Sequence, residues 1–342
     1  MKVGSSALPV GCAIARWPGA TQRESEWYNY FKIMTTATQI TREQHTVPQW
    51  HLKRFTDSGG VLWRYMPGKP VKKSRPKGEC WEPDFYEYEV NGKTTNNKYE
   101  RWLGRIENDA ASRIEMLLSN RPVGLWDVTV WATYVASLFA RSPKYRAQVS
   151  GTMIQKFREE TASDDYVRNL QHGLLQKGEL VSFESLREDT DRLREKMEKS
   201  PSYYHLVGLD RHVVSISEVL MRKAWWIVQA PPEKFFVMSD CPVTTVEVIN
   251  GQASPGVGFG KEQALVFLPL TPRHVFAATS PLIRYPAIGD AKFVDSINHL
   301  TVQFAHKRVF ANVGSTGIAT LVDNHMGRII FGQNAFIPAN RN

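Results

Sequence analysis

The segment VTVWATYVASLFA at residues 128–140 places the strongest constraint on the fold. It falls well short of the roughly 20 apolar residues that a membrane-spanning helix needs, so we expect no membrane span here. Its large apolar side chains recur at helical spacing, at Trp131, Tyr134, Val135 and Leu138. This spacing predicts a helix from about Trp126 to Arg141, which Pro143 ends or kinks.

Another apolar stripe lies just upstream of this helix. Its members also follow helical spacing, at Tyr99, Leu103, Ile106, Ala110, Ile114 and Leu117. They predict a helix over Tyr99–Leu118. Within it, Glu100 and Glu107 are one heptad apart, which is about 20° in projection, so both carboxylates point the same way.

Two charged residues lie at the buried edges of these helices. Glu107 is only about 20° in projection from Ile114, and Arg141 is about 20° from Tyr134. Neither charge is tolerated unpaired there, so we expect the two to pair. Two interpretations stay open: a salt bridge that fixes the fold, or a cleft of two carboxylates and an arginine suited to metal or phosphate chemistry.

Short apolar or alternating runs bounded by turn residues predict strands before and after the helical middle. Upstream, a strand over Val61–Met66 lies between glycine-containing turns, and FYEYEV at 85–90 leads into an Asn-Gly hairpin turn. Downstream runs of the same kind are AWWIVQA, KFFVMSD, ALVFLPL and HVFAATS. A late helix is expected over Phe293–Ala311, while GIATLVD and GRIIFG are ambiguous between strand and loop.

These elements predict an α+β fold with a basic β-hairpin N-terminal part, a helical middle, and a mixed or antiparallel β lobe with a late helix. We expect residues 34–342 to form a single domain, divided into parts at 34–98, 99–230 and 231–342. Residues 1–33 are interpreted as a disordered leader or a mis-assigned start. The charge-dense stretch 155–200 is expected to form solvated helices, as a lid or outer layer.

The basic residues are unevenly distributed. The chain has 43 Lys and Arg against 34 Asp and Glu, a formal net charge of +9. Between Arg42 and Lys77 there are nine basic residues and only two acids. Such a local field suits a polyanionic partner, most commonly nucleic acid, although a solvated basic surface is the simpler alternative.

The cysteines do not predict a disulfide framework or a cysteine zinc site. Cys12, Cys80 and Cys241 are widely spaced, odd in number, and include no CxxC pair. A reducing, cytoplasmic compartment is therefore the default expectation.

Several further polar residues are candidates for chemistry. Asp240 ends the run KFFVMSD, where it could be a metal ligand or general base, or a turn residue that caps its own backbone. His45 and His51 are not spaced for a shared metal site, so His45 is considered alone, as a base or as a hydrogen-bonded structural residue. Asn298 lies at the border of the late helix's apolar face.

Taken in order along the chain, these features form a set of separated motifs. They are Gln44-His45-x-Val47-Pro48, Leu62-Trp63-x-Tyr65, Asp84-Phe85-Tyr86, Ile106-Glu107, Arg141-x-Pro143, Ser239-Asp240-x-Pro242 and Leu268-Pro269-Leu270-x-Pro272. Over about residues 40–315 the set resembles the bacterial family known as domain of unknown function 4238. Family openings resemble QHYVPQFYLRNF, and His51 stands where an aromatic residue is usual, which argues against an essential role for it.

The resemblance implies no established activity, but it implies which polar positions such proteins share. These are His45, Glu100, Glu107, Arg141, Asp240 and Asn298. They include the two residues that the helical geometry selects independently, Glu107 and Arg141.

The first functional hypothesis is a metal-dependent nuclease or other phosphoryl-transfer enzyme, as in a bacterial toxin or defence effector. Glu100, Glu107 and Asp240 would hold Mg²⁺ or Mn²⁺, His45 would activate water, and Arg141 would steady phosphate charge. The predicted substrate contacts are Arg64, Lys72, Lys73 and Asn298.

Two alternatives remain. One is a non-catalytic module that binds nucleic acid or protein, in which His45, Glu107 and Arg141 form a structural polar network. The other is a cytoplasmic hydrolase that uses Cys241 or His45. The sequence predicts neither the substrate nor the oligomeric state.

Overall fold

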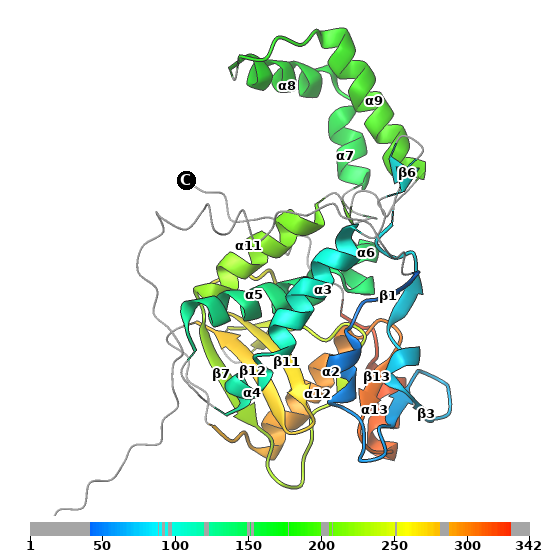
Figure 1. Cartoon of the computed structure of the whole chain (residues 1–342), viewed down its shortest axis with the longest axis vertical. Coiled ribbons are helices and arrows are strands. Elements are labelled where there is room, and N and C mark those ends of the chain that lie inside the picture. Colours follow the sequence, from blue (N-terminus) through cyan, green and yellow to red (C-terminus); the bar gives the residue numbers. More distant parts are fainter. Residues whose placement is uncertain are drawn as a thin grey trace, which may run out of the picture.

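The computed structural model describes residues 42–87, 89–90, 93–94, 98–119, 123–148, 151, 154–176, 178–199, 205–206, 208–249, 252–280 and 287–329 (Figure 1). The predicted leader at 1–33 lies outside the described residues. The fold is α+β, as predicted, with antiparallel sheets and a helical middle. No helix in the part of the chain that the structure describes is long and apolar enough to cross a membrane.

A five-stranded antiparallel sheet forms the centre of the body, in the order β10-β9-β11-β12-β7. Its strands are β7 (Ala224–Gln229), β9 (Thr244–Ile249), β10 (Gln252–Pro255), β11 (Ala264–Thr271) and β12 (His274–Thr279). Strand β11 is buried along nearly its whole length. A central strand that is covered on both faces explains why ALVFLPL is continuously apolar instead of alternating.

The two faces of this sheet pack against different helices. Trp225, Val266 and Phe276 point into a core shared with the helical layer. Their neighbours Trp226, Phe267 and Val275 point to the opposite face, against the late helix α12 (Ala291–Phe304). The period-two alternation of strand side chains therefore separates two cores.

The helical layer comes from the middle of the chain and contains both predicted helices. Its members are α3 (Lys98–Ala111), α4 (Ile114–Leu118), α5 (Leu125–Ala140), α6 (Pro143–Gln148) and α11 (Leu209–Met221). Helix α5 is buried from Val128 to Ala140, because it lies among α3, α11 and the sheet (Figure 1). The strongly apolar run at residues 128–140 is thus part of the central helix of the body.

A second, four-stranded sheet has the order β3-β2-β13-β8 and joins the N-terminal part to the end of the chain. Its strands are β2 (Leu62–Tyr65), β3 (Lys72–Ser74), β8 (Met238–Ser239) and β13 (Val309–Ala311). The predicted basic hairpin is present as β2–β3. Around it lie β1 (Glu43–His45), α2 (Gln49–Lys53), the 3-10 helix η1 (Pro76–Gly78), β4 (Trp81–Pro83) and α13 (Thr316–His325).

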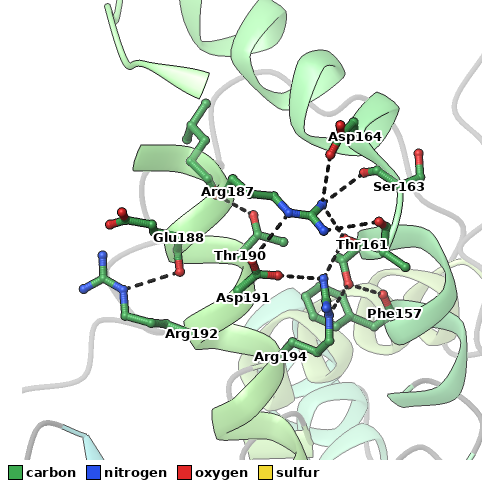
Figure 2. Close-up of polar contacts among 12 residues, drawn as sticks. Phe157, Thr161, Ser163, Asp164, Arg187, Glu188, Thr190, Asp191, Arg192 and Arg194 are labelled. Carbon is green, nitrogen blue, oxygen red and sulfur yellow. Dashed lines mark hydrogen bonds and ion pairs between the residues drawn. The ribbon is translucent and has the colours of Figure 1, made fainter. Parts of the chain in front are cut away.

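Helices α7 (Ile154–Thr161), α8 (Asp164–Gln176) and α9 (Phe183–Lys199) form an arm that stands away from the body (Figure 1). Two arginines of α9 bind the turn between α7 and α8 (Figure 2). Arg187 donates to the carbonyls of Thr161 and Ala162, each at 3.2 Å, and Arg194 donates to Thr161 O at 2.8 Å. These contacts satisfy the last carbonyls of α7, which have no partner within their own helix.

Four predictions about individual elements were wrong. The helix expected over Tyr99–Leu118 breaks after α3, where the Arg113 Nε donates to Asp127 of α5 at 3.0 Å. The late helix ends at Phe304, and β13 replaces its expected last turn. The segment GIATLVD is helical, because Ser315 caps α13 by accepting from Ile318 N at 3.3 Å.

The fourth correction concerns the strands. Phe85 and Tyr86 lie in a turn, and only β5 (Glu89–Val90) and β6 (Lys93–Thr94) form the expected hairpin. KFFVMSD is likewise extended with only Met238–Ser239 paired in a ladder. In both segments aromatic residues fill the core without joining a sheet.

Candidate functional site

The pairing of Glu107 with Arg141, expected from helical geometry, is confirmed. Arg141 is the first residue after α5, and its Nη1 donates to Glu107 Oε1 of α3 at 2.5 Å. The arginine side chain is fully buried, whereas 20% of the glutamate side chain is exposed. The pair therefore has one end in the core and the other at the surface.

Arg141 is surrounded by phenol groups as well as by Glu107. Tyr86 and Tyr134 both lie close enough to raise the pKa of Arg141, although the Glu107 carboxylate contributes more and burial opposes the shift. Among the described residues, Arg141 Nε and Nη2 have no hydrogen-bond partner of good geometry, although the Tyr86 hydroxyl lies close to the guanidinium group. A buried guanidinium with spare donors is an unusual arrangement, because such groups are normally satisfied.

Glu100 lies one heptad before Glu107 on α3 and is partly buried. Burial, together with the nearby carboxylates of Glu107 and Glu87, raises the pKa of Glu100 to about 7, while Arg141 opposes the shift. This carboxyl group is therefore poised to exchange a proton near neutral pH. A carboxyl with this property beside an ion pair is a common feature of acid–base sites.

His45, at the end of β1, lies close enough to Glu107 and Arg141 for their charges to act on it. Its Nε2 lies 3.3 Å from Gln49 Nε2, which can only donate, so Nε2 is the acceptor. The proton is then on Nδ1, in the hydrogen bond to the Lys77 carbonyl. Burial lowers the pKa of His45, although this hydrogen bond and Glu107 act in the opposite direction. The ring is therefore neutral at pH 7, with an accepting Nε2.

Gln44 and Tyr86 hold this arrangement together from one strand and one turn. Gln44 Oε1 accepts from Tyr86 N at 2.5 Å, and Gln44 Nε2 donates to Glu87 at 3.2 Å. The Tyr86 hydroxyl donates to the carbonyl of His45 at 2.9 Å. The site thus contains a network that we call the polar cluster, consisting of His45, Tyr86, Glu100, Glu107 and Arg141.

Sequence reasoning found four members of the polar cluster and missed the role of Tyr86. Gln44 and Gln49 were not selected either, since an amide side chain carries no charge pattern. A signal for both was available, because Gln44 adjoins His45 and Gln49 follows it by four residues at the start of α2.

Comparison with known sequences shows the family of this chain. A family model described as "Protein of unknown function (DUF4238)" matches residues 43–315, which is most of the chain. The chain belongs to this family. No curated protein and no solved structure matches it. Membership of DUF4238 therefore confirms the resemblance seen in the motifs, and any function has to be argued from the geometry.

His51 has a structural role in this DUF4238 chain. It is fully buried, and its Nε2 donates to the carbonyl of Pro269 at 2.8 Å. Its Nδ1 accepts from the Tyr134 hydroxyl, also at 2.8 Å. Burial lowers the pKa of His51 to about 4 despite the Pro269 hydrogen bond, so the ring is neutral and links α2 to α5 and β11.

Asp240 and Asn298 both bind backbone. The Asp240 carboxylate accepts from the amides of His306 and Lys307 at 2.8 Å each and of Arg308 at 3.1 Å. Asn298 accepts from Val237 N at 2.9 Å and donates to Phe235 O at 2.8 Å. Asp240 therefore does not cap its own backbone, as one of the two interpretations expected, but binds the amides of a distant loop.

The structure does not assemble the predicted metal ligands into one donor set. Within the described ranges, no three His, Cys, Asp or Glu side chains are placed so that they could hold a metal ion. Asp240 is committed to backbone amides, and Glu107 to Arg141. These residues do not fit the Mg²⁺ or Mn²⁺ site of the first hypothesis, so we derive no step through a metal.

Of the predicted substrate contacts, Arg64, Lys72 and Lys73 lie on the hairpin β2–β3, whereas Asn298 lies on α12. Arg64 donates to the buried Glu79 at 2.9 Å and is largely covered. Lys72 is exposed, and Lys73 lies over the Trp63 ring, with its Nζ 4.9 Å from the ring centroid. The hairpin leads directly into η1, whose Lys77 carbonyl holds His45. The exposed basic side chains are thus continuous in sequence with the polar cluster.

The remaining nucleophile candidate is inert. Cys241 is buried beside Asp240, and burial strongly raises the pKa of its thiol, with a further contribution from the Asp240 carboxylate. A thiol with a raised pKa forms little thiolate at neutral pH. The hydrolase alternative therefore has no support from Cys241.

Proposed function

We propose that this DUF4238 protein is a phosphoryl-transfer enzyme, a nuclease, that cleaves nucleic acid at the polar cluster. The observation that carries the proposal is Glu100, a carboxyl group with a pKa of about 7 on the same helix face as the Glu107–Arg141 pair. A proton donor and a neutral histidine in one cluster provide both halves of general acid–base catalysis.

In the proposed step, water attacks the phosphorus of a phosphodiester. Water displaces the Gln49 amide from His45 Nε2, which then takes the proton of the water. The carboxyl group of Glu100 gives its proton to the oxygen that leaves as the P–O bond breaks. Gln49 and the Lys77 carbonyl set the tautomer that this requires. The basic side chains from Lys69 to Lys77 supply contacts for the phosphate backbone.

Arg141 has a positioning role in this proposal. Its side chain is fully buried, so it does not touch substrate in this conformation. It holds Glu107, whose charge acts on both Glu100 and His45. The requirement for Mg²⁺ or Mn²⁺ stays a prediction, which the cleavage assay below tests by comparing these ions with EDTA.

The alternative is a non-catalytic module that binds nucleic acid or protein. It is favoured by the enclosure of Arg141 and by the commitment of Asp240 and Asn298 to backbone groups. In this case the polar cluster joins α3, α5 and β1 and has no further role.

The test is cleavage of single- and double-stranded DNA and RNA by purified protein, with Mg²⁺, with Mn²⁺ and with EDTA. We expect cleavage that Glu100→Gln and His45→Ala each reduce by about 10²–10⁴-fold. Glu184→Gln, an exposed change on α9, is the matched control and should retain full activity. Binding without cleavage, unchanged in the two variants, would support the module instead.

A further inference from the structure

The arm has too small a core to stabilise it alone. Among its described apolar side chains, Val167 and Leu186 are buried, while Leu170, Leu175 and Leu180 are 39%, 54% and 88% exposed. Exposed leucines that gather on one projecting element commonly mark an interface.

The exposed charged side chains of the arm are mainly acidic. The acids include Asp164, Asp165, Glu179, Glu184, Glu188 and Asp189, and the exposed bases are Arg158, Arg168 and Arg192. Arg187 and Arg194 are mostly covered, since they bind the internal turn shown in Figure 2. The arm therefore exposes leucines together with an excess of acidic side chains.

The hairpin β2–β3 presents the opposite pattern. Its basic side chains are exposed, at Lys69, Lys72, Lys73, Arg75 and Lys77. Beside them, Val313 is 41% exposed, and its carbonyl accepts from Tyr65 of β2 at 2.7 Å. The hairpin thus exposes basic side chains with part of Val313 close to β2, and the buried acid Glu79 is already paired with Arg64.

We propose that the arm of one copy docks on the β2–β3 hairpin of a second copy, and the reverse. One chain carries both complementary surfaces, so a reciprocal pair with twofold symmetry covers both arms and closes without further subunits. Helix α9 has 17 residues, which span about 25 Å, and this length carries the leucines away from their own body. The opposite charges of the arm and the hairpin select the partner face and speed association.

The inference does not rest on the proposed nuclease activity, but both proposals use the basic side chains of the hairpin, so a docked arm and nucleic acid would compete for them. Its test is sedimentation velocity without nucleic acid, from nanomolar to high micromolar protein, in low and high salt. We expect a monomer–dimer equilibrium whose dissociation constant rises by about tenfold or more in high salt. Salt screens the attraction between the acidic arm and the basic hairpin.

Leu175→Glu combined with Leu180→Glu should abolish the dimer, because it places charge where the interface buries exposed leucines. Lys72→Glu with Lys73→Glu should weaken it by about tenfold or more, and Glu179→Lys with Glu184→Lys in the same chain should restore it by exchanging the two signs. The matched control is Ile249→Glu. Ile249 is 49% exposed on β9, and it belongs to neither the arm nor the hairpin.

A chain that stays monomeric up to high micromolar concentration would overturn the proposal. So would a dimer that the arm variants leave intact. Circular dichroism of every variant confirms that it retains its helices, and since the arm and hairpin variants change separate regions, misfolding of one leaves the other as a test.

Discussion

Two groups of arginines in this chain bind carboxylates in very different surroundings. Arg141 is fully buried and pairs with Glu107 in the body. Arg187 and Arg194 pair with aspartates in the arm, where about a quarter of each arginine side chain and half or more of each aspartate are exposed. The contacts are chemically alike, yet the surroundings give them different consequences.

In the body, water reaches Glu107 but not Arg141. Removing Glu107 therefore leaves a fully buried guanidinium without its carboxylate. In the arm, water solvates whatever is left, and each ion pair contributes little. The comparison teaches that the polar cluster is a rigid, specified arrangement, whereas the arm is held together by several weak contacts.

The strongest way to test this contrast is Glu107→Leu. We expect it to lower the free energy of unfolding by about 3–5 kcal/mol, because the fully buried Arg141 loses its carboxylate partner. Urea unfolding followed by tryptophan fluorescence measures this change.

The companion variant is Arg141→Met with Glu107→Leu. Removing both charges should recover much of the lost stability, since no unpaired group remains. A loss below about 1 kcal/mol for Glu107→Leu would show that the pair behaves like an exposed one, and the contrast would be wrong.

The next largest effect concerns Asp240. Asp240→Asn replaces an acceptor by an amide NH₂ that faces backbone N–H groups, which should cost about 2–3 kcal/mol of unfolding free energy. The control is Asp295→Asn, an exposed change on α12. If Asp240 were instead a catalytic or metal-binding group, its asparagine variant would lose cleavage activity while its unfolding curve hardly changed.

The third prediction concerns Glu100, whose substitution is expected to stabilise the fold, in contrast to the two preceding substitutions. The folded pKa of about 7 lies above the ordinary 4.5, so the stabilising contribution of the neutral form is fully present below pH 4.5 and is lost as the pH rises through 7. Glu100→Gln cannot ionise. We expect it to be more stable than wild type above pH 8, by about 2 kcal/mol after allowance for partial exposure, with no such gain near pH 4.

Chemical denaturation at several pH values measures this difference. Glu184→Gln on the arm should show no such pH-dependent gain. Equal stability of Glu100→Gln and wild type at every pH would mean that Glu100 is solvated like a surface carboxylate.

The smallest effect is expected in the arm. Arg187→Ala removes carbonyl and aspartate contacts at the α7–α8 turn, shown in Figure 2, and should cost about 1 kcal/mol or less. Hydrogen exchange should become faster in α7–α9 and stay unchanged in α5. Faster exchange across α5 as well would show that the arm and the body unfold as one unit.

The sequence predicted those parts of the fold in which burial repeats with a regular period. The helix around Trp131 and the pairing of Glu107 with Arg141 followed from spacing alone. Spacing failed where a distant group decides the structure. The late helix ends after Phe304 because the next amides bind Asp240, a residue more than sixty positions away.

The candidate site was predictable to a similar extent. Glu100, Glu107 and Arg141 could be selected because they share helix faces or buried edges. The raised pKa of Glu100 could not be predicted, since it depends on how deeply the side chain is buried. The tautomer of His45 depends on a carbonyl of the basic segment, Lys77, which no local pattern places beside it.

The most direct test of the central claim is the titration of Glu100 itself. Carbon-detected NMR of the glutamate side-chain carboxyls, recorded from pH 4 to pH 9, follows each group separately. We predict one glutamate with a midpoint at about pH 7, whose signal is absent from the Glu100→Gln spectrum. A spectrum in which every glutamate titrates near its ordinary value of 4.5, or in which the pH 7 signal persists in Glu100→Gln, would contradict the assignment of Glu100 as the proton-exchanging group.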